Sequence, residues 1–248
     1  MNTITRARIV CAALLSLFVY AGAASQEVTP LDGKATLARI DAYREFAKAG
    51  FSFDFSLEDG KGASSVMRVY LDGDNRETSI AKYALPKKYA RRVVLTVKNA
   101  FFIFDRGMPA PVRITPREML FGQASAGDIT RISFSGMYSV ESQTKKGSEL
   151  VISLKAIPDK GATYDMIDLR VDGVTFKPIA ATCKGASGTA IKTIAYESFT
   201  VFSGKELLSA FSITDCANGE TSKVRLDNFK GETLPPSNFT LEAIKYVR

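Results

Sequence analysis

The sequence predicts a mainly β protein with a few helices, built on one strongly curved antiparallel sheet. From residue 51 onward, apolar residues alternate with polar ones, as in Phe51, Phe53 and Phe55, which is typical of half-buried strands. About ten to twelve such segments follow one another at short spacing, with turn residues between them. A sheet of that size cannot stay flat, so we expect it to close or to curl around something.

One segment has the period of a helix. In residues 30–49, Leu37, Ile40, Tyr43 and Phe46 recur every three residues and form an apolar stripe. Gly50 follows, and glycine readily adopts the left-handed conformation that ends a helix. We therefore predict a helix over residues 30–49.

The strands fall into two groups. Residues 51–55, 66–71, 78–85, 91–97 and 101–104 predict five consecutive strands of an antiparallel meander. The second group is predicted at residues 131–140, 149–155, 166–171, 175–182, 191–200 and 209–214, with a last strand at 222–229. Asp172-Gly173 is a strong hairpin signal. A short helix or turn is expected over residues 239–243.

The first 25 residues have the pattern of a cleaved secretory signal. Arg6 and Arg8 precede a short apolar run, and small residues at 21–25 offer a cleavage site. The apolar run is too short to span a membrane. We expect residues 26–248 to form a single domain that is exported to the periplasm, and Cys11 to be removed with the signal.

Two cysteines remain, Cys183 and Cys216. In an oxidising compartment they are predicted to pair, which in the chain-entropy model adds roughly 3–4 kcal/mol of stability. Two unpaired buried thiols are the alternative. No metal site is predicted, because zinc sites need clustered cysteine and histidine and the chain has 0 histidines.

The formal net charge is +7, and two of the arginines leave with the signal. The remaining cations, such as Lys87-Lys88 and Arg91-Arg92, are expected near strand ends, either as solvated loop residues or as a contact for anionic lipid headgroups. Nucleic acid is not an expected partner, because no basic and aromatic binding motif is present.

The sequence offers little for catalysis. The absence of histidine excludes the usual Ser-His-Asp, Cys-His and zinc-histidine schemes. Carboxylate pairs such as Asp165 with Asp168 lie in turn-like or alternating polar positions, which does not favour a glycosidase site. We expect no enzyme and no cofactor.

The apolar faces of neighbouring strands are the most informative feature. Side chains of one parity would form a broad, aromatic-rich concave wall. The wall is either an ordinary core filled by the predicted helix or the lining of a ligand cavity. One amphipathic helix is a thin filler for so large a sheet, which favours an apolar cavity.

Residues 101–134 carry a resemblance to the LolA-like family of outer-membrane lipoprotein-sorting proteins. The aromatic strand 101–104 is followed by Pro111-Val112-Arg113-Ile114-Thr115-Pro116, then by Met119-Leu120-Phe121-Gly122-Gln123-Ala124-Ser125, and then by Asp128. The stretch from Leu234-Pro235 to Phe239 is similar to the family's terminal segment. The Cys183–Cys216 pair has no counterpart in this resemblance, and the chain has no tryptophan.

The resemblance implies a half-open barrel whose helices form a lid over an apolar cavity, in a periplasmic carrier of acylated lipoproteins or other lipids. The predicted wall residues are Phe51, Phe53, Phe55, Val69, Leu71, Leu95, Phe102 and Phe104. Arg113 and Arg117 are candidates to contact a lipid headgroup or a partner, or else to bond loop and lid. An envelope transporter or membrane acceptor is an expected partner, and we expect a monomer. A non-enzymatic accessory module of such a transporter, with a filled core, is the alternative.

Overall fold

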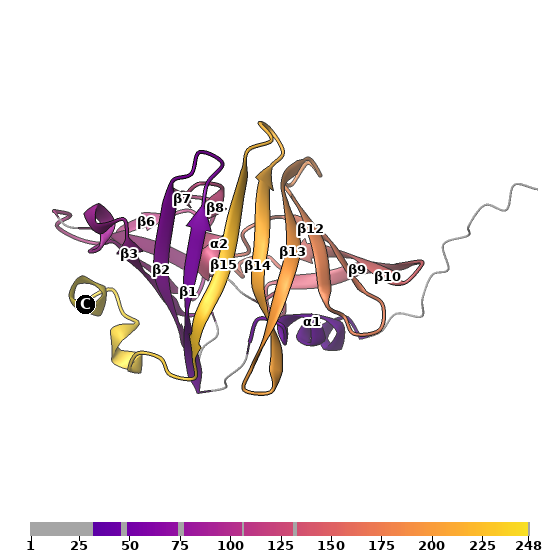
Figure 1. Cartoon of the computed structure of the whole chain (residues 1–248), viewed down its shortest axis with the longest axis horizontal. Helices are drawn as coiled ribbons and strands as arrows, with labels where there is room; N and C mark the ends of the chain where they lie inside the picture. The colour runs from indigo at the N-terminus through magenta and orange to yellow at the C-terminus, as the bar shows by residue number, and fades with distance from the viewer. Residues whose placement is uncertain (1–31, 46–48, 74–76, 106, 131–132, 248) are drawn as a thin grey trace, which may run out of the picture.

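The computed structural model describes residues 32–45, 49–73, 77–105, 107–130 and 133–247. They form a 13-stranded sheet in the order β6-β5-β4-β3-β2-β1-β15-β14-β13-β12-β11-β10-β9, in which every neighbouring pair is antiparallel. The sheet curves strongly, and its two halves lean apart on either side of β15 (Figure 1). The prediction of one curved antiparallel sheet is confirmed. The predicted signal, residues 1–25, lies outside the described residues.

The first half is a meander. Its strands are β1 (Gly50–Glu58), β2 (Ser64–Asp72), β3 (Ser79–Leu85), β4 (Val93–Val97), β5 (Ala100–Phe104) and β6 (Val112–Ile114), with a 3-10 turn η1 (Lys87–Tyr89) between β3 and β4. The second half contains β9 (Tyr138–Lys146), β10 (Glu149–Ala156), β11 (Met166–Asp172), β12 (Pro178–Lys184), β13 (Ala190–Phe202), β14 (Lys205–Asp215) and β15 (Thr221–Lys230). Local hairpins therefore build almost the whole sheet.

The exception is the pairing of β1 with β15, which joins the two halves. Phe55 lies opposite Leu226 and Leu57 lies opposite Val224. The first and last strands of the sheet therefore lie beside each other near its middle, while β6 and β9 form its edges. The side-chain amide of Asn99, at the β4–β5 turn, donates to the carbonyl of Asp159 after β10, so the two halves touch at that point.

A segment between the two halves lies across the concave face, and we call residues 115–130 the plug. It contains a small hairpin of β7 (Met119–Phe121) and β8 (Ala124–Ser125), followed by the helix α2 (Ala126–Thr130). Ile129 and Ala124 are fully buried against the strands of the first half and β14. The predicted strand at 131–140 is wrong for residues 133–137, because β9 begins only at Tyr138, and residues 131–132 lie outside the described residues.

The helix α1 (Gly33–Asp41) is shorter than the predicted 30–49. The Asp32 carboxylate caps its start, and its last turn tightens through bonds from Tyr43 to Ile40 and from Arg44 to Asp41. The carboxylate of Asp41 accepts bonds from residues 133–135, which fixes the helix end against β9. Of the four stripe residues, Phe46 lies outside the described residues.

The buried face of α1 packs on the second half of the sheet. Leu37 and Ile40 belong to a cluster with Ile152, Leu169 and Phe176. The first half has a different cover, the plug. None of the described helices is long and apolar enough to cross a membrane.

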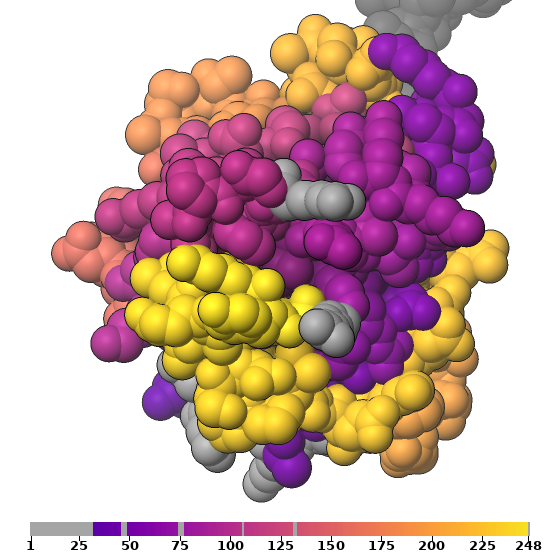
Figure 2. Space-filling model, turned by 90° about the vertical axis from the view of Figure 1, so that its left-hand side faces the viewer, coloured from indigo at the N-terminus to yellow at the C-terminus, as the bar shows by residue number. Residues whose placement is uncertain are grey.

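The C-terminal segment covers the outer face of the first half. It contains two 3-10 turns, η2 (Pro236–Asn238) and η3 (Ala243–Tyr246), where a short helix or turn was predicted over 239–243. Phe239 and Ile244 are buried against Ile80, Val93 and Leu95. In Figure 2 this segment lies directly against the strands of the first half. The first half is therefore buried on both faces.

The predicted Cys183–Cys216 disulfide is not formed, and both thiols are free. Lys192 of β13 pairs with Cys183 of β12 on one side and with Asp215 of β14 on the other. One strand, β13, therefore lies between the two cysteines. Two strand spacings put their Cα atoms roughly 9.6 Å apart. A disulfide spans at most ~7 Å between Cα atoms, so the two cysteines are too far apart to pair. Cys183 is buried and Cys216 is exposed.

Thiol titration of the chain lacking residues 1–25 should detect one fast-reacting thiol in the native state and a second only after unfolding. Cys216 is exposed, whereas burial raises the pKa of the Cys183 thiol well above its usual range and removes it from reagent. The Cys216→Ser variant should lose the fast phase. A native protein without a reactive thiol, lighter by two hydrogen atoms, would contradict the arrangement.

Candidate functional site

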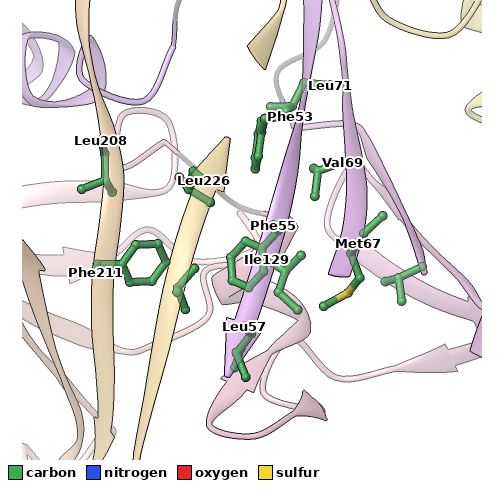
Figure 3. Close-up of a cluster of buried hydrophobic side chains, with 14 of the residues drawn as sticks. Phe53, Phe55, Leu57, Met67, Val69, Leu71, Ile129, Leu208, Phe211 and Leu226 are labelled. Atoms are coloured by element: carbon green, nitrogen blue, oxygen red, sulfur yellow. The ribbon is translucent and has the colours of Figure 1, made fainter. Parts of the chain in front are cut away.

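The candidate site is the concave face of the sheet. On β1 and β2, Phe51 lies opposite Leu71, Phe53 opposite Val69 and Phe55 opposite Met67, so these side chains share one face. All are buried under the plug, and Figure 3 shows Ile129 of α2 beside Phe55 and Met67. Five of the eight predicted wall residues therefore lie together on the concave face: Phe51, Phe53, Phe55, Val69 and Leu71.

The other three, Leu95, Phe102 and Phe104, lie on the outer face. Leu95 pairs with Phe102, and both contact the cluster formed with the C-terminal segment. The prediction of a single wall is wrong for these residues. The runs at 93–95 and 101–104 are apolar at every position, so sequence alternation cannot indicate which side chains point inward. On these strands Val94, Phe101 and Ile103 face the plug side instead.

A buried polar cluster fixes the plug to the second half of the sheet. The Asp128 carboxylate accepts hydrogen bonds from the backbone N–H and hydroxyl of Ser125, at 2.9 and 2.8 Å, and from the Tyr164 hydroxyl at 2.8 Å. Lys192 Nζ lies 3.0 Å from Asp128 Oδ2, and their side chains are only 5% and 4% exposed. The same ammonium donates to the carbonyl of Gln123 at 2.6 Å.

The sequence reasoning missed this ion pair. Asp128 belongs to the motif that resembles the LolA-like family, and Lys192 lies in the strand predicted at 191–200, and neither position by itself predicts an ion pair. One signal was present: Lys192 shares the parity of Ile194 and Tyr196, which line the concave face. A lysine in an inward position of a strand needs an acidic partner.

Other bonds attach the plug to the first half. The Tyr83 hydroxyl donates to the Leu120 carbonyl at 3.1 Å, and burial raises the pKa of Tyr83 to about 12. The Thr96 hydroxyl bonds the Thr130 hydroxyl at 2.8 Å. The plug therefore makes polar contacts with both halves of the sheet and connects them.

Of the two predicted headgroup contacts, Arg117 is a structural residue. Its Nε donates to the Thr163 carbonyl at 2.8 Å, and its guanidinium pairs with Asp165 at 2.5 Å. This matches the alternative in which it bonds loop to lid. Arg113 is exposed on the edge strand β6, opposite Phe102.

A glycine lets the plug approach the loop after β10 closely. A Cβ atom on Gly127 would lie 2.0 Å from Thr163 Oγ1. Any larger residue in this position would push α2 away from that loop. A small cavity lies between α2, Arg44 and residues of the second half of the sheet.

The cavity has a volume of ≈ 50 Å³. Its apolar lining includes Phe134, Met137, Ile167, Ile194 and Phe211, and its polar lining includes Arg44, Asp128, Tyr138, Tyr164 and Tyr196. Burial raises the pKa of Tyr138, Tyr164 and Tyr196, so all three phenols are neutral at physiological pH. The described residues contain no cluster of three acidic or cysteine side chains that would hold a metal.

Removing one member of the Asp128–Lys192 pair should destabilise the fold by about 3–5 kcal/mol, because the other charge stays buried without compensation. We expect this for Asp128→Asn and for Lys192→Met, measured by urea unfolding at neutral pH. The double variant should lower the free energy of unfolding by less than the sum of the two single variants. Lys61→Met removes an exposed pair with Glu220 and serves as the control, with an expected cost of about 0–1 kcal/mol. Equal costs for Lys192→Met and Lys61→Met would contradict the assignment.

The comparisons with solved structures agree on the fold. A LolA superfamily protein from Nitrosomonas europaea is 24% identical, with a TM-score of 0.76 over 86% of this chain and 99% of that one. A domain named as an outer membrane lipoprotein-sorting protein, from Vibrio parahaemolyticus, is 13% identical, with a TM-score of 0.66 over 86% and 98%. A DUF1329 family protein from Desulfovibrio piger is 13% identical, with a TM-score of 0.69 over 86% and 97%.

These likenesses confirm the predicted half-open, LolA-like architecture. No curated protein matches the chain. A family model described only as "Uncharacterized protein" matches residues 75–246, which include all of the plug and most of the sheet. The chain therefore belongs to that uncharacterized family, and its fold is the fold of the LolA superfamily.

Proposed function

We propose that the protein is a periplasmic carrier that binds acyl chains of lipoproteins or other lipids and transfers them across the envelope toward the outer membrane. The supporting observation is the cover of the concave face. The apolar concave face is closed by one helix and by a short plug, which contains only a two-stranded hairpin and a short helix. Such a cover can leave the wall without unfolding it. Residues 1–25 are proposed to direct export and to be removed.

The physical requirement for a carrier is an exchange of one apolar contact for another. Burying an acyl methylene yields about 0.8 kcal/mol, so a chain of ordinary length offers several kcal/mol. The plug gives up the contacts of Ile129 and Leu120 when it moves. Uptake is favourable where the acyl chain replaces these contacts, and release follows when the plug returns.

The closed cavity fixes the order of events in this proposal. Its ≈ 50 Å³ is far below the ~300–1,000 Å³ of typical ligand pockets, so an acyl chain cannot enter until α1 or the plug moves. We propose that the mature chain, residues 26–248, acts as a single domain and a monomer, without catalysis. Its proposed partners are an envelope transporter or a membrane acceptor.

The same small volume favours a second candidate. In it, the protein is an accessory module that docks on an envelope transporter and keeps a filled core. This candidate needs no movement of the plug and predicts no lipid uptake. The carrier and the accessory module are therefore separated by lipid binding.

Native mass spectrometry with lipid extraction, on protein purified from the periplasm, should detect acyl-chain species bound at near one-to-one. The extracted lipids would also identify the cargo class. A clean apo mass, together with no uptake of added lipid or lipopeptide, would reject the carrier and favour the accessory module.

A cross-link of the plug should abolish lipid uptake. The Gln123 backbone N–H donates to Ser222 Oγ at 2.9 Å, so Gln123→Cys with Ser222→Cys would join the plug to β15. The cross-link is made in a background with Cys183→Ala and Cys216→Ser, and reduction should restore uptake of a fluorescent acyl probe.

The matched control cross-links the β13–β14 hairpin, which does not involve the plug. Val201 and Glu206 are paired there and can be replaced by cysteines in the same background. Oxidation of this control should leave uptake unchanged. Unchanged uptake in the oxidised plug variant would mean that lipid binding needs no plug movement.

A further inference from the structure

The side chain of Arg44 carries a buried donor that finds no hydrogen-bond partner among the described residues. The residue follows the last turn of α1 and is half-buried, and the donor is its Nε atom. Within the described part of the chain, its guanidinium forms no ion pair. A partly desolvated guanidinium normally finds an anion, because unmet donors of a charged group are costly.

The guanidinium faces the cavity beside Tyr196. Both residues line it. Burial raises the pKa of Tyr196, so its hydroxyl stays a neutral donor. Together they offer a positive charge and a neutral O–H donor at one end of an apolar cavity.

The nearby acidic side chains are engaged elsewhere. Asp128 lines the same cavity, but Lys192 and the hydroxyls of Ser125 and Tyr164 compensate its charge. Asp41 accepts bonds from Ser133, Phe134 and Ser135. Neither of these two carboxylates forms an ion pair with Arg44 within the described residues.

We propose that this cavity binds the anionic head of a single-chain amphiphile, a carboxylate or a phosphate monoester, through Arg44 and the Tyr196 hydroxyl. The inference rests on the proposed carrier function and names its ligand class. The hydrocarbon chain extends from the head along Ile194 and Phe211, into space that opens when the cover moves. The volume already suits a head of this size, because ≈ 50 Å³ is enough space for a few water molecules.

The test titrates the chain lacking residues 1–25 with decanoate, decyl phosphate and decanol, by isothermal titration calorimetry. The wild type should bind at least one of the two anions about 10-fold or more tightly than decanol, as a charge-assisted bond requires. The two anions distinguish a carboxylate site from a phosphate site. This comparison uses only wild-type protein, so it holds even if a variant fails to fold.

Arg44→Met should remove the preference for the anion and leave decanol binding unchanged, whereas Arg44→Lys should keep part of the preference. Tyr196→Phe should weaken binding of the anions and leave binding of decanol unchanged. Arg113→Met is the matched control, because Arg113 is exposed on the edge strand and was the competing headgroup contact. It should leave all three affinities unchanged.

Two outcomes overturn the proposal in different ways. If decanol binds as tightly as both anions, or if Arg44→Met keeps the preference, the head site is rejected while the carrier function stands. If none of the three compounds binds and native mass spectrometry also finds no lipid, the carrier function itself fails.

Discussion

The buried ion pair between Asp128 and Lys192 is the contact on which the closed state of the half-open barrel depends. Each charge costs several kcal/mol to remove from water, and the pair recovers this only through good geometry and further hydrogen bonds. Here Ser125, Tyr164 and the Gln123 carbonyl supply those bonds. A polar contact of this kind sets the position of the plug more exactly than apolar packing would, because a displaced charge would be left buried and unpaired.

The rest of the architecture follows from the open sheet. Its edge strands β6 and β9 do not pair with each other, so the barrel cannot close by backbone hydrogen bonds. The plug and α1 fill the concave side instead: α1 packs on the second half, and the plug bridges both halves. The pairing of β1 with β15 keeps these halves together. The cover is thus made of separate short segments on a continuous scaffold, which is the arrangement that a reversible cavity needs.

Most strands and the curvature were predictable, because alternation and turn residues are local signals. The alternating β1 also revealed its buried face, so Phe51, Phe53 and Phe55 were assigned correctly to the concave side. Leu95, Phe102 and Phe104 were not, since a strand buried on both faces has no polar residue to mark parity. The Cys183–Cys216 pairing and the role of Lys192 depend on which strands are neighbours across the sheet, and a single sequence does not contain that information.

The buried Lys192 and the half-buried Arg44 differ in one respect that bears on function. Lys192 is paired with Asp128 of the plug, and this ion pair therefore stabilises the closed position of the plug. Arg44 has no ion-pair partner within the described residues, and in our proposal its anion is supplied by the ligand. Binding an anionic head beneath α1 would add a charge-assisted bond in the ligand-bound state that the closed state lacks. The closed and loaded states are then stabilised by different ion pairs, and a modest difference between them is enough for both uptake and release.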